Sequence, residues 1–485
     1  MTAADAITTY SPVAQTDKRV PLRLSPDEWI WPAVFMLGMT MVGLCFPLGY
    51  VVVLVAMLRS FHKSRYDFVI MLTIYAGGYS LALTEETFMT RGVVLLISIV
   101  AIFNIEKSAV VKRVLWGMLI LFLIFSFFAL RGVVGYFSQI SPMLNRLSMI
   151  WFVVPLWAFR NQEFEIKEFF RRTVPYSMIV CIYYFLDAAV MGDQFFLPRD
   201  PMYSQEFKPT FYNLRLHMFS FAFARRWQPA LYLLILSLYP AMRYYKLPVW
   251  MWAAVLVAMY IVRTFSVIMG FLVAALSLSR RRGQILKYII IAAVSLTVLY
   301  FVDDALGPPD ESGSTTLRIK SQIDQITGFA AIGGDEDALA EAGTGRGAQI
   351  LPAFELFTDF HKEWTGFGFL SEESTPHQYF YDSEFIEDED EAERLVTNVE
   401  SEPFVVLFQN GYIGLIVHYG FFVWLWFVVR RMRYSRFFLT VLLFDFVSGL
   451  AGCSGLYRPE GLYLLGLSLA CVILANRRPE PDAAE

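Results

Sequence analysis

Apolar runs of the length of a membrane-spanning helix recur along most of this 485-residue chain. A bilayer core takes about 20 apolar residues per helix, and fewer when a helix is short or re-entrant. Only 17% of the residues are charged, against about a quarter in soluble domains, so we expect the apolar surplus to face lipid. The sequence predicts an all-α polytopic membrane protein. The apolar runs are 67–84, 92–104, 114–130, 147–159, 175–191, 229–241, 285–302, 405–429, 437–453 and 461–475.

Two further stretches, 30–58 and 247–279, are too long for one helix and short for two. The first is broken near Pro47-Leu48-Gly49 and the second is interrupted by Arg263. Because Lys and Arg concentrate in cytoplasmic loops, the basic clusters decide how the chain is threaded. They all fall on one side only if both stretches are hairpins, which gives roughly 14 spans, or roughly 12 to 13 if one stretch is a single tilted helix. The clusters are Lys18/Arg19/Arg23, Arg59/His62/Lys63/Arg65, Lys107/Lys112/Arg113, Arg160/Lys167/Arg171/Arg172, Arg243/Lys246, Arg280/Arg281/Arg282, Arg430/Arg431/Arg433/Arg436 and Arg477/Arg478.

This threading divides the chain into tails, helices and exported loops. A cytoplasmic tail, 1–29, without a cleaved signal peptide precedes a helix bundle, 30–302, that includes an exported loop at 192–228. A larger exported loop, 303–404, is followed by C-terminal helices at 405–475 and a cytoplasmic tail at 476–485. The second half of the larger loop is dense in aromatic residues and carboxylates, so we expect it to be partly helical and to pack over the bundle as a cap.

Charged residues within apolar runs are candidates for a functional site, because the bilayer rejects them. Arg263, in MYIVRTFSVIMGFL, would lie at the outer apex of a hairpin and face an exported cavity. Asp187 and Asp445 are each as readily structural hydrogen-bonding partners as parts of a site. In the loops, Arg215 and Arg346 complete a set of three arginines that would suit a pyrophosphate, although salt bridges to nearby carboxylates are an alternative for these two.

The sequence indicates no cofactor and no metal ion. It contains no Walker loop, dinucleotide fingerprint or HExxH motif, and nothing indicates a nucleic-acid partner. The acidic run 387–391 offers oxygen ligands for a divalent cation, but a solvated surface is the simpler interpretation.

The order of motifs from Arg263 to Gly414 resembles the bacterial O-antigen polymerase and O-antigen ligase group, the Wzy-type polymerases and WaaL-type ligases. The resemblance rests on the VRTFS break, the large exported loop, and the sequence GRGAQILPAFELFTDFHKEWTGFGF with its turn Gly366-Phe367-Gly368. In that group the loop ends with His, a small polar residue, nine residues, Gly, two residues and Gly. Here Glu400-Ser401 precede nine residues and Gly411-Tyr412-Ile413-Gly414. The Glu in place of the catalytic His of the ligases favours a polymerase.

The resemblance implies a glycosyltransferase C fold and a glycan donor carried on undecaprenyl pyrophosphate at the periplasmic face of the bacterial inner membrane. It implies a separate flippase, and often a chain-length regulator, as pathway partners. Glu400 is then the expected base, with His377 as a competitor, and the arginines stabilise the leaving pyrophosphate without a metal ion. A ligase-type glycan transferase and a transporter of lipid-linked glycan remain open.

Aromatic residues in the cap offer flat faces on which sugar rings could stack, although aromatics in a cap are as often simple packing. The candidates are Trp364, Tyr379 and Tyr381, with Phe380 beside them. His361, three residues before Trp364, is expected to help set the turn that leads to Gly366.

Overall fold

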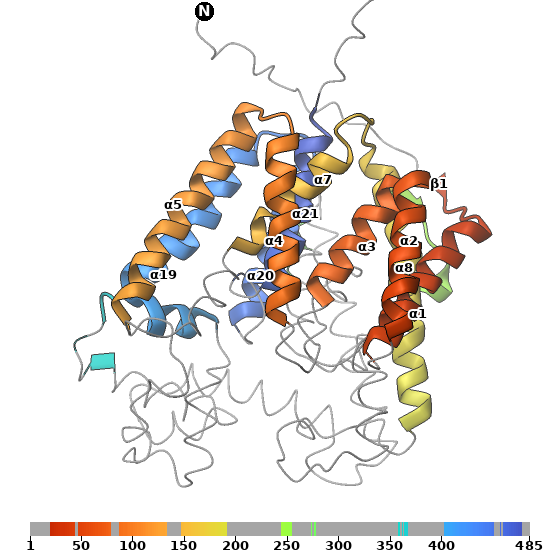
Figure 1. Ribbon diagram of the computed structural model, residues 1–485, viewed down its shortest axis with the longest axis horizontal. Helices are drawn as coiled ribbons and strands as arrows, with labels where there is room; N and C mark the ends of the chain where they lie inside the picture. Colours follow the sequence, from red (N-terminus) through yellow and green to blue (C-terminus); the bar gives the residue numbers. More distant parts are fainter. Residues whose placement is uncertain are drawn as a thin grey trace, which may run out of the picture.

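The computed structural model describes residues 20–43, 47–78, 87–132, 147–191, 244–254, 402–450 and 459–477, with 273, 276–277, 357–358, 361, 363–366 and 456. This part of the chain is mostly helical, and its helices lie side by side in a bundle (Figure 1). The strands described are β1 (Val20–Pro21) and β2 (Tyr245–Lys246), which pair in parallel. The described residues are therefore mostly helical, as the sequence predicts, with one short pair of strands.

The stretch 30–58 forms two helices, as predicted. Helix α1 (Pro26–Gly43) is followed by α2 (Pro47–Lys63), and a proline at the first helical position is favourable because its missing N–H would have no partner there. The two helices pack closely at Gly38, where a Cβ atom would lie 2.9 Å from Cγ1 of Val52 and 3.0 Å from Cγ2 of Val53. Residues 255–272, including Arg263, lie outside the described residues, so the second predicted hairpin stays a prediction.

The other predicted runs that fall among the described residues coincide with helices. Run 147–159 differs from the rest, because it begins as a 3₁₀ helix and continues as a short α-helix. It forms part of the core, as a Cβ on Gly466 would lie 2.9 Å from the carbonyl oxygen of Met149. The helices are α3 (Arg65–Gly78), α4 (Thr87–Asn104), α5 (Ala109–Gly132), η3 (Leu147–Phe152), α7 (Val153–Ala158), α8 (Ile166–Met191), α19 (Glu402–Val429), α20 (Ser435–Leu450) and α21 (Pro459–Leu474).

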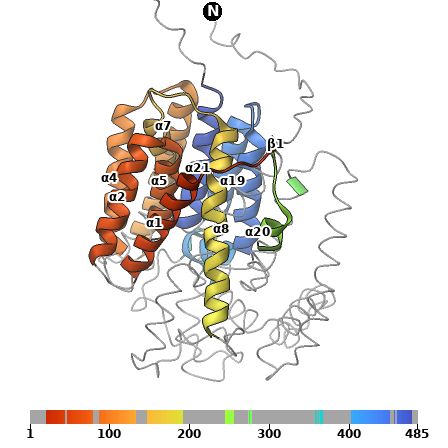
Figure 2. The ribbon, with the colours of Figure 1, turned by 90° about the vertical axis from the view of Figure 1, so that its right-hand side faces the viewer.

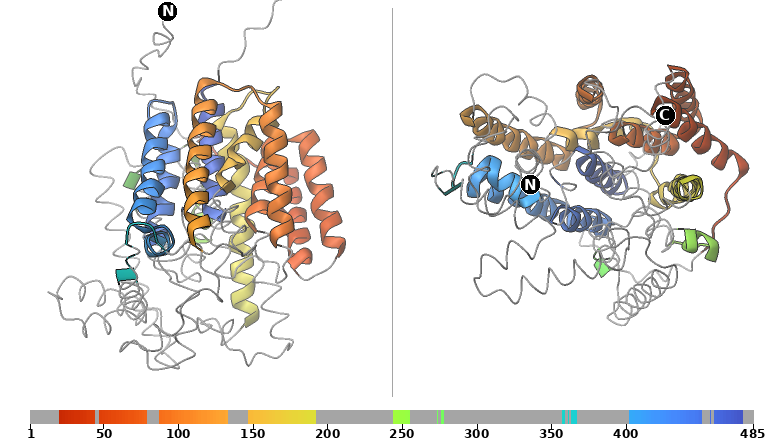
Figure 3. Two further views of the ribbon diagram at one scale, coloured as in Figure 1. Left: turned by 60° about the vertical axis from the view of Figure 1, so that its left-hand side comes forward. Right: turned by 90° about the horizontal axis from the view of Figure 1, so that it is seen from below.

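Helix α21 lies in the middle of the bundle, and its side chains from Gly461 to Val472 are all buried (Figure 2). It packs against η3, where Trp151 is fully buried and its Nε1–H donates a hydrogen bond of 3.0 Å to Oγ1 of Thr73 on α3. Among the described residues, two helices are long and apolar enough to cross a bilayer, Ala109–Phe127 within α5 and Glu402–Val429, which is α19. These two helices lie side by side although about 270 residues separate them in the sequence (Figure 3).

The loops that carry the basic clusters contact one another at one end of the bundle, the upper end in Figure 1. Arg477, after α21, forms a 2.8 Å ion pair with Glu106 before α5. Its guanidinium also donates to the carbonyl oxygen of Arg160, after α7, at 3.1 Å. The side chain of Asn476 donates to the carbonyl oxygen of Arg433, between α19 and α20, at 2.9 Å. Four segments that are distant in the sequence thus share this end.

The N-terminal segments join the same end. The backbone N–H of Glu165 donates to the hydroxyl oxygen of Tyr66 at 2.8 Å, which links the loop after α7 to the start of α3. The pairing of β1 with β2 and the 3.3 Å hydrogen bond from Leu22 N–H to the Lys246 carbonyl add the segments before α1 and around β2. The cluster Arg280–Arg282 lies outside the described residues.

Candidate functional site

Of the predicted site residues, Trp364 and Asp445 lie among the described residues. Glu400, His377, Arg263, Arg346, Arg215, Tyr379 and Tyr381 lie outside them, as does the side chain of Asp187 on α8. Two pieces of the motif order are nevertheless described, the turn that ends at Gly366 and the glycines Gly411 and Gly414. These pieces, with the residues that contact them, form the candidate site.

The turn at Gly366 packs directly against α19 at Gly411. The backbone N–H of Tyr412 donates to the carbonyl oxygen of Glu363 at 2.8 Å, and that of Ile413 to Trp364 at 3.4 Å. Gly366 and Gly411 both have positive φ, of 67° and 65°. A Cβ on Gly366 would overlap the backbone of Asn410, and a Cβ on Gly411 would overlap the backbone of Trp364. Both positions therefore require glycine, for conformation and for space.

Gly411 also divides α19 into two helical pieces. Its φ of 65° and ψ of −172° interrupt the helix, and the residue before it, Asn410, is fully buried. In a straight helix, residues 402 and 418 would be about 24 Å apart along the axis. Instead, Oε1 of Glu402 lies 3.4 Å from Nε2 of His418 and accepts a 3.2 Å hydrogen bond from the Tyr419 hydroxyl. The kink thus folds the first piece of α19 back onto the second.

Glu402, His418 and Asp445 form a buried polar cluster where α19 meets α20. Each of these side chains is at most 1% exposed. Glu402 packs against Gly449 of α20, where a Cβ would overlap its Oε2 atom, and its carboxylate repels that of Asp445 electrostatically. Neither carboxylate oxygen of Asp445 has a hydrogen-bond partner among the described residues. Because an unbalanced buried charge is costly, Glu402 and His418 are stabilised by the contact that they make with one another.

Trp364 is held at the surface of this site by its neighbours and keeps one side open. Its side chain is 65% exposed, and its ring meets the ring of Tyr412 edge to face at a centroid distance of 5.9 Å. Tyr412 in turn contacts the buried Phe357 at 6.1 Å. His361, just before this turn, has a φ of 52°, and its backbone N–H donates to the Thr358 carbonyl at 3.0 Å.

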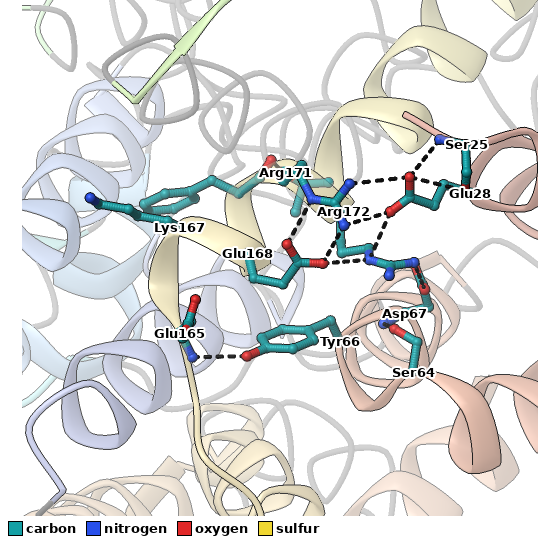
Figure 4. A network of polar contacts seen from close by, with 12 residues as sticks. Ser25, Glu28, Ser64, Tyr66, Asp67, Glu165, Lys167, Glu168, Arg171 and Arg172 are labelled. Carbon is teal, nitrogen blue, oxygen red and sulfur yellow. Dashed lines mark hydrogen bonds and ion pairs between the residues drawn. The ribbon is translucent and has the colours of Figure 1, made fainter. Parts of the chain in front are cut away.

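At the end of the bundle away from the turn at Gly366, a network of ion pairs joins α1, α3 and α8 (Figure 4). Arg171 of α8 pairs with Glu28 of α1 at 2.7 Å, and Arg172 pairs with Asp67 of α3 at 3.1 Å. Glu168 of α8 accepts hydrogen bonds from both arginines, at 2.7 Å from Arg171 and 2.8 Å from Arg172. The sequence interpretation counted the arginines as a basic loop cluster. Their carboxylate partners, two of them on other helices, were not predicted.

The charge on Glu168 is stabilised within this network. Burial raises the pKa of the Glu168 carboxyl, but the hydrogen bonds and positive charges of Arg171 and Arg172 outweigh burial, so the net pKa is lowered. The same contacts raise the pKa of Arg171. All charges in the network therefore have partners, which is typical of a structural clamp between helices.

Sequence reasoning also missed Glu402 and His418. A glutamate and a histidine flank Gly411 within a run that is otherwise strongly apolar, and this pattern could have indicated a kinked helix with polar contacts across the kink. Among the described residues, no group of three or more His, Cys, Asp and Glu side chains has the arrangement of a metal site. The chain matches no family model, and a search of curated proteins finds no match.

Proposed function

We propose that the chain is a polytopic enzyme of the bacterial inner membrane that joins glycan repeat units carried on undecaprenyl pyrophosphate at the periplasmic face. The product would be an O-antigen, an exopolysaccharide or a capsule. The observation that carries the proposal is the packing of the turn that ends at Gly366 against α19 around Gly411. These two segments belong to motifs that were grouped by their order along the sequence alone, and a single shared site requires such segments to lie together.

The proposed membrane placement is supported by the surface and by the loops. Because loops rich in Lys and Arg are retained in the cytoplasm, the end of the bundle that gathers them is the cytoplasmic end. Large apolar side chains are exposed along the outer faces of two helices, as expected of a lipid-facing surface. They are Val51, Leu54, Val55 and Leu58 of α2 and Trp116, Leu119, Ile120, Leu123 and Phe127 of α5.

This placement puts the start of α19 at the periplasmic end. The second piece of α19 runs from Gly411 to Val429, just before the basic residues, so Gly411 lies at the end away from them. Glu400 precedes Glu402 by two residues. Glu402 is held by its contacts with His418 and Tyr419, so the described chain begins at a fixed point two residues after the proposed base.

In the proposed reaction, the Glu400 carboxylate accepts the proton of an acceptor sugar hydroxyl. The hydroxyl oxygen forms a bond to the anomeric carbon of the donor, and the bond from that carbon to the pyrophosphate oxygen breaks. The leaving pyrophosphate takes the electron pair, and Arg263, Arg346 and Arg215 stabilise its charge. In-line displacement inverts the anomeric configuration. His377 is the alternative base, and Trp364, Tyr379 and Tyr381 are proposed to contact sugar rings.

Substitution of the proposed base tests the mechanism. In a strain that depends on this chain for polymer, Glu400→Gln should lower polymer synthesis by about 100-fold or more, because a general base contributes that much. Glu393→Gln is the matched control, since it removes a carboxylate from the same loop outside the motif. Polymer length and protein level are measured together. Long chains made by the Glu400 variant at normal protein level would show that Glu400 is not the base.

A further inference from the structure

A groove runs between α5 and α19 on the outer face of the bundle. It encloses about 530 Å³ and is apolar along its length, with two basic side chains at one end. Val417 and Gly420 of α19 line one side, and Ile120 and Ile124 of α5 line the other. The basic residues are Lys112 and Arg113, near the start of α5.

The groove results from antiparallel packing around two glycines. Gly117 of α5 receives the ring of Trp424, so closely that a Cβ on Gly117 would lie 2.5 Å from ring atoms Cη2 and Cζ3. Further along, Phe125 of α5 meets His418 of α19 at a centroid distance of 6.1 Å. Gly420 lies between these two contacts, and a Cβ there would have nothing within 4 Å. The helices therefore touch above and below an open space.

The basic residues at the end of the groove are available to an anionic group. Lys112 and Arg113 are exposed, and neither forms an ion pair with another residue of the described part. Other arginines at this end are engaged, for example Arg477 with Glu106. Two cations at the mouth of an apolar groove are complementary to a lipid with a negatively charged headgroup.

The length of the groove fits one leaflet of a bilayer. From Lys112 to Ile124, α5 rises about 18 Å at 1.5 Å per residue. The hydrocarbon core is about 30 Å thick, so the groove spans a little more than half of it. Trp116, which lines the groove and is 64% exposed, lies next to the basic residues at the level where tryptophan prefers the interface.

We infer that this groove binds an anionic glycerophospholipid of the cytoplasmic leaflet. Its phosphate lies on Lys112 and Arg113, and an acyl chain occupies the apolar space at Gly420. The inference rests on the membrane placement of the proposed function, but not on its transferase chemistry. If the chain shows no preference for anionic lipids, the proposal that Glu400 is the base is unaffected. If Glu400 proves not to be the base, the lipid site is equally unaffected.

The inference is tested by native mass spectrometry of the full chain in mild detergent. The chain is titrated with phosphatidylglycerol, cardiolipin or phosphatidylcholine. We expect the two anionic lipids to be retained more strongly than phosphatidylcholine. A basic residue near an anionic group contributes a factor of about five, so the double variant Lys112→Gln with Arg113→Gln should weaken retention about thirtyfold.

Two further variants separate the groove from general charge effects. Gly420→Leu extends an apolar side chain into the space where a Cβ has nothing within 4 Å, and it should also weaken retention of the anionic lipids. Lys63→Gln with Arg436→Gln removes two exposed cations from the same end outside the groove, and should leave retention unchanged. If phosphatidylcholine is retained as strongly as the anionic lipids, or if this control loses as much retention as the Lys112/Arg113 double variant, lipid binding is non-specific and the inference is overturned. If the chain instead forms a dimer that retains no lipid, the groove is occupied by a second copy of the chain and the inference is overturned.

Discussion

Gly411 determines the course of α19 more than any other single residue. Its φ of 65° and ψ of −172° lie in a region that is essentially restricted to glycine. Without this kink, Glu402 and His418 would be about 24 Å apart along one helix and could not meet. The buried cluster and the packing of the turn at Gly366 both depend on this one backbone conformation.

Replacing Gly411 with alanine should destabilise the protein. Backbone strain alone costs roughly 1–3 kcal/mol, and overlap with the backbone of Trp364 adds to it. Gly420→Ala is the matched control, because position 420 is helical and its surroundings are open. There, alanine should leave stability unchanged or raise it by up to about 1 kcal/mol. Thermal unfolding of both variants in the same detergent measures the difference, and equal melting temperatures would contradict the role given to Gly411.

The sequence predicts residues of this kind only in part. The motif order picks out the turn at Gly366 and the glycine at Gly411, and both positions require glycine in the structure. The contact between Glu402 and His418 could not be predicted, because hydropathy reports a continuous apolar helix through Gly411. Which side chains meet across a kink depends on the two backbone angles at a single residue.

At the level of elements, the ion-pair network holds the starts of α1, α3 and α8 together. Arg171 connects α8 to α1 through Glu28, and Arg172 connects α8 to α3 through Asp67. Such pairs are strongly coupled, because each arginine also bonds Glu168. Loss of charge on one carboxylate therefore weakens contacts of more than one helix.

The network should make stability depend on acidic pH. Because the pKa of Glu168 is lowered in the folded protein, its charge stabilises the fold fully above the ordinary value of 4.5. This contribution is lost as pH falls below 4.5 and through the lowered pKa. The melting temperature should therefore fall with pH in this range, and Glu168→Gln should reduce the slope. Glu106→Gln, which alters an exposed pair, is the control, and identical slopes in all three proteins would refute the role of Glu168.

Helix positions are predicted well by hydropathy, but their internal form is not. Runs such as 92–104 and 461–475 coincide with α4 and α21, because length and apolarity decide that they are helices. Run 147–159 divides into η3 and α7, and it is buried in the core by contact with α21. Apolar composition cannot tell a helix that faces lipid from one that is surrounded by protein.

For the whole molecule, the proposed threading predicts on which side of the membrane each loop lies. Single cysteines are introduced at Arg478, after α21, and at Ser383, in the loop 303–404, in a background with the native cysteines replaced. A membrane-impermeant thiol reagent applied to intact spheroplasts should label the cysteine at 383. The cysteine at 478 should be labelled only after lysis, because the proposed threading places its end of the bundle in the cytoplasm. Labelling of both, or of 478 alone, in intact cells would contradict the proposed threading.

The seven predicted site residues that lie outside the described part show which properties of a site can be predicted from one sequence and which cannot. Residue type and spacing suggest a chemistry for Glu400 and the arginines, because guanidinium groups suit pyrophosphate and a carboxylate can accept a proton. Distances among them depend on how a hundred-residue loop packs over the bundle, which no local pattern determines. The nearest described parts, Glu402 at the start of α19 and the turn at Gly366 in the middle of that loop, both contact the second piece of α19.

The central claim is that this chain extends lipid-linked glycans, and the lipid-linked intermediates test it most directly. They are extracted from a strain that lacks the chain, and their length is measured by mass spectrometry. The account predicts that undecaprenyl pyrophosphate carrying single repeat units accumulates and that the wild-type chain reverses this. Accumulation of long lipid-linked polymers would indicate transfer of finished chains instead, and an unchanged lipid pool would contradict a role in glycan assembly.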